Sequence, residues 1–238
     1  YHGVVPIESD HAIVWGKVNE DYFRHIGIPE EKIHTIGTPI FDNLKDLNSI
    51  DSEEGYVLLA TSGPTKAVAF DLTIETIEKN IETIKKIAEI VVSHNKKLIV
   101  KLHPSPEEYD PSKILRKINP EIEIIKSGNI AELIKKCILF IVIDETTSIL
   151  DAHLLRKPVL SVAVKAEEFG LPTVLKNDSC AVTDLSSFEK IFYQMIGDDE
   201  FRNKIIKNAN KSIQKYISFP YDGATTLLTF LEKFENKL

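Results

Sequence analysis

The sequence lacks most features that mark secreted, membrane-spanning or metal-dependent proteins. Its only two cysteines, Cys137 and Cys180, are too few for a disulfide framework and indicate a reducing, cytosolic environment. The longest uninterrupted apolar run, Cys137 to Ile143, is far shorter than the ~20 residues that a membrane-spanning helix requires. HExxH, CxxC, GxSxG and Walker motifs are missing, so we expect no metal ion and no cofactor.

An excess of positive charge is also missing. Lys and Arg number 29 against 36 Asp and Glu, which gives a formal net charge of −7. Because a nucleic-acid backbone needs a cationic surface, this balance argues against a nucleic-acid partner. One predicted C-terminal helix carries a lysine stripe, which we interpret as a solvated face, with peripheral contact to anionic lipid as the alternative. The stripe consists of Lys204, Lys207, Lys211 and Lys215.

A starting methionine is not present either. The chain begins at Tyr1 and its single methionine is Met195, so we expect a piece of a longer protein. Hydrophobic residues make up 43% of the chain and charged residues 27%, which is typical of a globular protein with a sizeable core.

The sequence does contain a regular alternation of short apolar runs and amphipathic runs. The clearest amphipathic helix has an apolar residue at every third or fourth position from Ile74 to Val91. Strands are expected over residues 56–60, 98–102, 121–125, 137–143 and 159–162, with helices between and after them. This alternation predicts an α/β fold, a Rossmann-like parallel sheet with helices on both faces.

Two earlier strands, at 12–15 and 33–36, are separated from this pattern by the polar stretch NSIDSEEG at residues 48–55. We interpret this stretch as a linker, because it has no apolar period. The sequence thus predicts two units: residues 1–48, the remnant of a second Rossmann-like domain, and residues 49–238, the main domain with the C-terminal helices.

Ligands of a parallel sheet bind beyond the carboxyl ends of its strands. One such end carries Thr146, Thr147 and Ser148 at the start of a predicted helix. The first turn of a helix has unpaired N–H groups and a partial positive charge, which suit a phosphate. The alternative is a capping box, in which Ser148 and Asp151 satisfy the helix terminus alone. His103 at another strand end is either a structural residue or an acid, base or phosphate donor.

Five motifs in chain order resemble the GT-B glycosyltransferase superfamily. The resemblance is to its C-terminal donor-binding half, and is nearest to CDP-glycerol glycerophosphotransferases and related surface-polysaccharide biosynthesis proteins. The motifs are YHG (1–3), TIGTPIFDNL (35–44), VKLHP (100–104), IDETTSILDAHLLRKPVL (143–160) and DGATT (222–226).

The resemblance implies that residues 49–238 bind a nucleotide-diphosphate donor and that residues 1–48 belong to the acceptor-side domain. It implies catalytic roles for His2, as a base on the acceptor side, and for His103, at the donor phosphate. The implied phosphate-binding residues are Ser62, Gly63, Thr146, Thr147 and Ser148, and the implied nucleotide-binding residues are Ser127, Asn129, Ile130 and Asp151.

The resemblance further implies a transferase that moves a glycosyl or glycerophosphate group to a saccharide, polyol-phosphate or lipid-linked acceptor for surface polysaccharide. Such an enzyme is expected in the cytoplasm, with peripheral contact to the inner face of the membrane. Two alternatives stay open. One is an enzyme like the UDP-N-acetylglucosamine 2-epimerases, and the other is a nucleotide-binding module that is inactive as an isolated chain.

Overall fold

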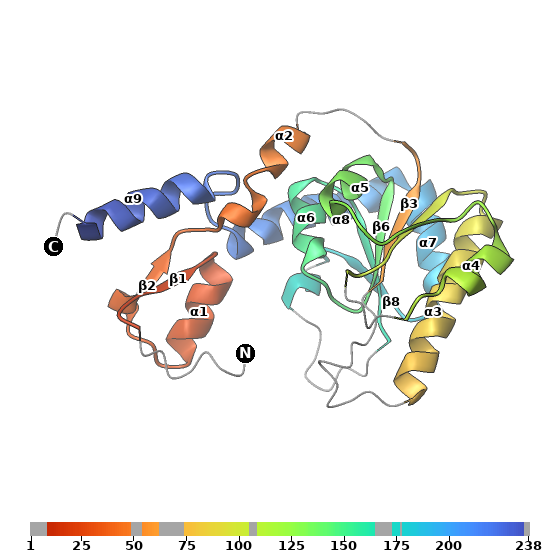
Figure 1. Cartoon of the computed structure of the whole chain (residues 1–238), viewed down its shortest axis with the longest axis horizontal. Coiled ribbons are helices and arrows are strands. Elements are labelled where there is room, and N and C mark those ends of the chain that lie inside the picture. Colours follow the sequence, from red (N-terminus) through yellow and green to blue (C-terminus); the bar gives the residue numbers. More distant parts are fainter. Residues whose placement is uncertain are drawn as a thin grey trace. The chain divides into compact units, whose positions relative to one another are not determined.

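The computed structural model describes residues 9–48, 54–61, 74–104, 109–164, 173–176 and 178–235 (Figure 1). The chain divides into two compact units. One unit comprises residues 50–210, and the other combines residues 1–49 with residues 211–238.

The unit of residues 50–210 is built on a six-stranded sheet in the order β5-β4-β3-β6-β7-β8, and every neighbouring pair is parallel. This confirms the predicted α/β fold with a parallel sheet. The strands are β3 (Val57–Ala60), β4 (Leu98–Lys101), β5 (Glu123–Ile125), β6 (Leu139–Ile143), β7 (Val159–Val162) and β8 (Ala181–Thr183).

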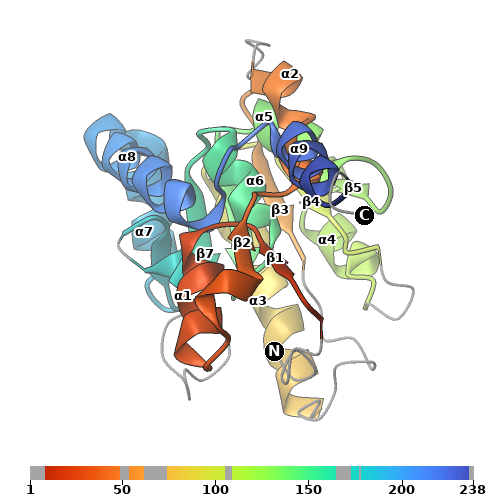
Figure 2. The same cartoon turned by 90° about the vertical axis from the view of Figure 1, so that its left-hand side faces the viewer.

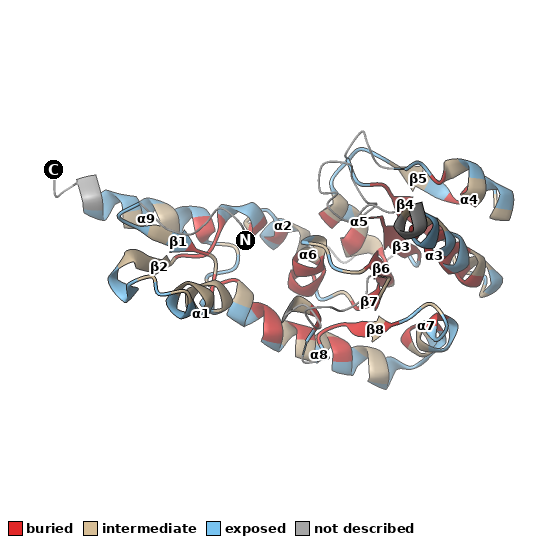
Figure 3. Cartoon of the chain, turned by 90° about the horizontal axis from the view of Figure 1, so that it is seen from below, coloured by how far each residue is buried: buried red, intermediate tan, exposed pale blue. Residues whose placement is uncertain are grey.

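Helices cover both faces of this sheet (Figures 1 and 2). One face carries α3 (Ile74–Ser93), α4 (Ser112–Ile118) and α7 (Phe188–Gly197), and the other carries α5 (Ile130–Lys136) and α6 (Ser148–Leu154). The central strands are buried on both faces, which explains why they read as unbroken apolar runs (Figure 3). A 3-10 turn, η4 (Thr173–Leu175), precedes β8, and α8 (Asp199–Tyr216) begins in this unit and ends in the other.

The second unit begins with a parallel βαβ element. Its strands β1 (Ala12–Val14) and β2 (Ile33–Thr35) pair with each other, and α1 (Lys17–His25) connects them. A parallel pair joined by a helix is the basic repeat of a Rossmann-like domain. Short elements follow: η1 (Glu30–Lys32) before β2, then η2 (Pro39–Phe41), α2 (Leu44–Asn48) and the C-terminal α9 (Gly223–Glu235).

The C-terminal segment differs from the expected division of the chain. Residues 211–238 were expected to belong to the main domain, but they group with residues 1–49. The physical reason lies at the start of α9, where both carboxylate oxygens of Asp42 accept backbone hydrogen bonds. Asp42 Oδ1 accepts from the Gly223 N–H at 2.9 Å, and Oδ2 accepts from the Ala224 N–H at 2.8 Å. A carboxylate at a helix N-terminus satisfies unpaired donors and the helix dipole together.

Two glycines make this packing possible. A Cβ atom on Gly223 would collide with the Thr38 carbonyl group, and one on Gly37 would collide with the Ser218 carbonyl oxygen. Gly37 also has a φ of +86°, which a residue with a side chain rarely adopts. The GTPIFD and DGATT motifs, far apart in the sequence, are therefore parts of one contact.

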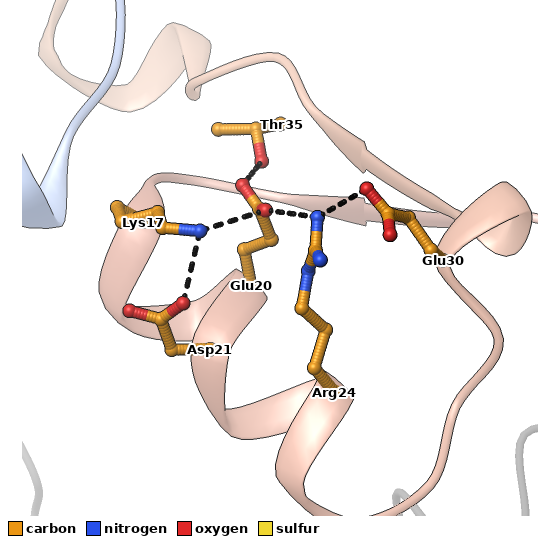
Figure 4. A network of polar contacts seen from close by, with 6 residues as sticks. All are labelled: Lys17, Glu20, Asp21, Arg24, Glu30 and Thr35. Atoms are coloured by element: carbon orange, nitrogen blue, oxygen red, sulfur yellow. Dashed lines mark hydrogen bonds and ion pairs between the residues drawn. The ribbon is translucent and has the colours of Figure 1, made fainter.

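A polar network fastens α1 to β2 in the same unit (Figure 4). The Glu20 carboxylate accepts from Lys17 Nζ at 3.0 Å, from Arg24 at 2.8 Å and from Thr35 Oγ1 at 2.8 Å. Arg24 also contacts Glu30 at 2.6 Å. The hydrogen bond from Lys17, followed by the one from Thr35, lowers the pKa of Glu20 below its usual value.

Candidate functional site

The strand order brings the loops of the candidate site to one edge of the sheet. Because β3, β4, β5 and β6 are parallel neighbours, their carboxyl ends lie on the same side. The strand β3 lies between β4 and β6. His103 after β4 and the hydroxyl cluster after β6 are therefore about two strand spacings apart at the backbone, roughly 10 Å.

His103 is exposed, and its backbone is anchored by a neighbouring strand. Its N–H donates to Thr61 Oγ1 at 3.3 Å. Thr61 is buried directly after β3, and its own N–H donates to the Lys101 carbonyl oxygen at 3.0 Å. The structure thus places His103 at the carboxyl edge of the sheet, as predicted. Thr61, which contacts the backbone of His103, was not predicted as a site residue.

A second missed residue is Lys101, the last residue of β4. It is buried, and its Nζ donates to the carbonyl oxygens of Leu102 at 3.0 Å and of Lys126 at 2.9 Å. The sequence did contain a signal for this residue, namely a lysine within an otherwise apolar strand. Because lysine is seldom buried without partners, a lysine at such a position indicates specific hydrogen-bond partners. Its partners could not be predicted, since they depend on which strand lies next to β4.

The loop after β6 is held by Asp144, which adopts a φ of +56°. This conformation is uncommon for residues with a side chain, and aspartate tolerates it better than most. Asp144 Oδ1 accepts from the Val164 N–H at 2.8 Å, and its carbonyl oxygen accepts from Ser161 Oγ at 2.6 Å. The start of α6 is therefore fixed through contacts with β7 and the residues that follow it.

The hydroxyl cluster at the start of α6 comprises Thr146, Thr147 and Ser148. Thr147 occupies the N-cap position, but its side chain forms no capping hydrogen bond in the described part of the chain. Ser148 is the first helical residue and does not occupy the cap position that a Ser148–Asp151 capping box requires. Thr147 is exposed, while Thr146 and Ser148 are half-buried.

Asp151, in the first turn of α6, is half-buried. Among the described residues no side chain donates a hydrogen bond to it, and its carboxylate interacts with its own backbone N–H. Burial raises its pKa to about 6, and the contact with that N–H opposes the rise. A half-buried carboxylate without a side-chain partner is suited to accept hydrogen bonds from the hydroxyl groups of a ligand.

The loop between β5 and α5 holds the residues predicted to bind a base. Ser127 and Gly128 are exposed, and Gly128 has a φ of +98°. Asn129 is the N-cap of α5, and its Oδ1 accepts from the Ala131 N–H at 3.0 Å. The acceptor atom of Asn129 is therefore used to cap α5. Ile130 is the first residue of that helix and is half-buried.

Three predicted site residues, His2, Ser62 and Gly63, lie outside the described residues. Within the described ranges, no group of three or more His, Cys, Asp or Glu side chains could hold a metal ion. None of the helices that the structure describes has both the length and the apolar character needed to cross a membrane.

A surface depression of about 510 Å³ lies elsewhere, where α7 ends and α8 begins. Because α7 follows β8 and runs back along the sheet, this turn lies at the amino edge, opposite the candidate site. The lining residues are Asp198, Glu200, Phe201, Asn203, Lys204 and Lys207. The depression does not include the predicted site residues.

Comparisons with known proteins identify the fold. No protein-family model matches the sequence, and no curated protein matches it. Solved structures do match. MnaA from S. aureus, solved with UDP, has a TM-score of 0.64 and 15% identity over 97% of this chain and 61% of its own. The Neisseria meningitidis UDP-GlcNAc 2-epimerase, bound to UDP-GlcNAc, has a TM-score of 0.63 and 16% identity over 94% and 62%.

A glycosyltransferase from Rickettsia africae matches less closely, with a TM-score of 0.54 and 12% identity over 95% of this chain and 64% of its own. The chain has a GT-B-type, Rossmann-like fold. It spans less than two thirds of the length of each of these three proteins.

Proposed function

We propose that the chain is the nucleotide-diphosphate-binding part of an enzyme that acts on a nucleotide sugar. The donor would lie along the carboxyl edge of β4, β3 and β6. The observation that carries the proposal is Asp151, a half-buried carboxylate without a described side-chain partner, in the same helical turn as the hydroxyl cluster. A nucleoside diphosphate offers ribose hydroxyls to the carboxylate and phosphate oxygens to the hydroxyls and N–H groups.

The proposed chemistry depends on negative charge that develops as the nucleotide diphosphate leaves its sugar. The hydroxyls of Thr147 and Ser148, the N–H groups at the start of α6 and the His103 imidazole are donors of the required kind. Donors that are fixed before the reaction stabilise developing charge without reorganisation. The loop of Ser127, Asn129 and Ile130 would lie beside the base, and Ser62 and Gly63 would contribute to phosphate binding.

Two reactions fit such a site. In the first, the enzyme transfers a group to a saccharide, polyol-phosphate or lipid-linked acceptor, with His2 as the base that takes the acceptor's proton. Transfer of a glycosyl group would release the nucleoside diphosphate, and transfer of a glycerophosphate group would release the nucleoside monophosphate. The unit of residues 1–49 with 211–238 would then belong to the acceptor-side domain, in a cytoplasmic protein at the inner face of the membrane. The second reaction is epimerisation of the nucleotide sugar. It is favoured by the higher TM-score to the Neisseria meningitidis epimerase than to the Rickettsia africae glycosyltransferase.

Calorimetric titration of the full chain with UDP, CDP, GDP and UDP-GlcNAc tests the proposal. We expect one nucleoside diphosphate to bind, and Asp151→Asn to weaken that binding by about tenfold or more, as for loss of a hydrogen bond to a charged group. Glu145→Gln, which removes an exposed carboxylate from the same loop, is the matched control and should leave the affinity unchanged. Absence of binding by all four ligands at millimolar concentration would refute the proposal.

Product analysis separates the reactions. Incubation with UDP-GlcNAc and NMR detection of a 2-epimer would identify an epimerase. Release of UDP only when an acceptor is added would identify a transferase. Binding without either product, in this chain and in any longer protein that contains it, would identify a nucleotide-binding module.

A further inference from the structure

The peptide unit that joins Leu102 to His103 is bound by side chains at both of its polar atoms. The Leu102 carbonyl oxygen accepts from Lys101 Nζ at 3.0 Å, and the His103 N–H donates to Thr61 Oγ1 at 3.3 Å. This peptide lies just beyond β4, after the last ladder hydrogen bond from the Leu102 N–H to the Ile125 carbonyl oxygen. Two side chains therefore fix the backbone that carries His103 at a point where the sheet no longer does so.

Both of these side chains are buried, although His103 itself is exposed. The exposed fraction is 4% for Thr61 and 6% for Lys101. Burying an ammonium group is unfavourable unless hydrogen bonds compensate for the lost water. An apolar residue at the end of β4 would build the same sheet without that cost, which indicates that the lysine has a further role.

The contacts of Lys101 and Thr61 join the ends of three strands. Lys101 Nζ reaches the carbonyl oxygen of Lys126, the residue after β5, at 2.9 Å. Thr61 Oγ1 donates to the Lys101 carbonyl oxygen at 3.4 Å. The ends of β3, β4 and β5 are thereby connected at the edge of the sheet where the candidate site lies.

We propose that Thr61 and Lys101 are positioning residues that preorganise His103, and with it the loop after β5, to receive a nucleoside diphosphate. This inference rests on the proposed function. Neither residue needs to touch the ligand. Their role follows from geometry, because a displacement of about 1 Å in a binding group can reduce rates by about 10²-fold.

A double-mutant cycle tests whether Thr61 acts through His103. Thr61→Val removes the hydroxyl with little change in shape, and we expect it to weaken UDP binding by about tenfold, measured by calorimetry. Thr61→Ser keeps the hydroxyl and should retain the affinity. In a His103→Ala background, Thr61→Val should change the affinity less than twofold, because the group that it positions is already missing.

Thr183→Val is the matched control. Thr183 is also a buried threonine at the end of a parallel strand, and its Oγ1 donates to the Asp184 carbonyl oxygen at 3.0 Å. It ends β8, at the far side of the sheet from β4. We expect its replacement to leave UDP affinity unchanged, whereas an equal loss in both variants would assign a merely structural role to Thr61.

Lys101→Met keeps the aliphatic stem and removes the ammonium group. We expect faster amide hydrogen exchange at His103 and at residues 126–129. We also expect weaker UDP binding, and the loss in the double variant with His103→Ala should be smaller than the sum of the two single losses. Thr61→Val should accelerate exchange at the His103 amide in the absence of any ligand. Unchanged exchange in both variants would overturn the inference even if either variant binds UDP weakly.

The outcomes separate this inference from the proposed function. If the wild-type chain binds UDP but the losses from Thr61→Val and His103→Ala add in full, the positioning role is wrong and the nucleotide site stands. If the wild-type chain binds none of UDP, CDP and GDP, the proposed function is wrong and the inference falls with it.

Discussion

Different interactions stabilise the interior of each of the two units of the chain. The unit of residues 50–210 is organised by a sheet whose central strands β3, β6 and β7 are buried along their whole length. In the other unit the strands β1 and β2 have three residues each, and α1 has no buried residue. That unit buries a smaller set of apolar side chains, such as Val14, Phe41 and Leu44, and adds individual polar contacts, such as those of Asp42 and Glu20. The comparison predicts that core truncation damages the first unit most, and that single polar changes damage the second.

The largest expected effect is that of Leu59→Ala in the first unit. Leu59 is fully buried in β3, where it pairs with Val100 on one side and Ile141 on the other. Truncation of a buried leucine lowers the free energy of unfolding by about 2–5 kcal/mol. Hydrogen exchange followed by mass spectrometry should show this loss in peptides from residues 57–164.

The control for Leu59→Ala is Ile13→Ala in β1, whose side chain is 44% exposed. We expect it to change stability by about 0.5 kcal/mol or less, as surface substitutions usually do. Equal losses from the two substitutions would contradict the proposed difference between the units.

The next prediction concerns pH and two titratable residues of α6, Asp151 and His153. Burial lowers the pKa of His153 to about 4, from an ordinary value of 6.5, and raises the pKa of Asp151 to about 6. Between pH 6.5 and 4 the unfolded chain binds a proton at His153 that the folded chain does not, so acid removes about 3 kcal/mol of stability. Between pH 6 and 4 the folded chain binds a proton at Asp151 that the unfolded chain does not, so acid adds about 3 kcal/mol.

These two contributions nearly cancel in the wild-type chain between pH 6 and pH 4. Asp151→Asn should therefore make the protein lose stability on acidification over this range, and His153→Gln should make it gain stability. Urea denaturation at pH 4, 5, 6 and 7 measures both slopes. Parallel pH profiles for the wild-type chain and the two variants would show that these groups do not titrate as their burial predicts.

The difference between the two units also decides how much of each could be predicted from the sequence. The strands β3, β4, β6 and β7 were predictable because burial on both faces leaves unbroken apolar runs, whereas the short edge strand β8 was not predicted. His103 and Ser148 could be assigned to one edge because parallel strands share it. The roles of Thr61 and Lys101 were not predictable, because they depend on β3 and β5 lying beside β4. The contact of Asp42 with Gly223 was missed for a similar reason, since 181 positions separate the two residues.

Asp42→Ala should have an intermediate effect, confined to the second unit. It removes the acceptor for two N–H groups at the start of α9, and loss of a helix cap costs about 0.5–2 kcal/mol. Amide exchange in residues 223–235 should accelerate, while exchange in β3 and β6 should not change. Asp222→Ala removes an exposed carboxylate beside the same helix terminus and is the control, with an expected loss of less than about 1 kcal/mol. Equal acceleration in both units would show that they do not unfold separately.

The smallest expected effect is that of Glu20→Gln. The carboxylate has an exposed fraction of 17% and contacts two partly exposed cations, Lys17 and Arg24. Exposed ion pairs contribute about 0.2–1 kcal/mol, so we expect a loss of roughly 0.5 kcal/mol in urea denaturation at low ionic strength. Because about 1 M salt shortens the screening length to about 3 Å, much of this loss should disappear at that concentration. Glu31→Gln, at an exposed position of η1, is the control.

The pKa of Glu20 gives a second test of the same network. The pKa is lowered in the folded chain, chiefly by the hydrogen bond from Lys17, so the stabilising contribution is present above the ordinary value of 4.5. It is lost as the pH falls through the lowered value, because the carboxylate then binds a proton in both states. The difference between Glu20→Gln and the wild-type chain should therefore shrink on acidification. A loss that persists in about 1 M salt and in acid would mean that the hydrogen bond from Thr35, rather than charge, holds α1 to β2.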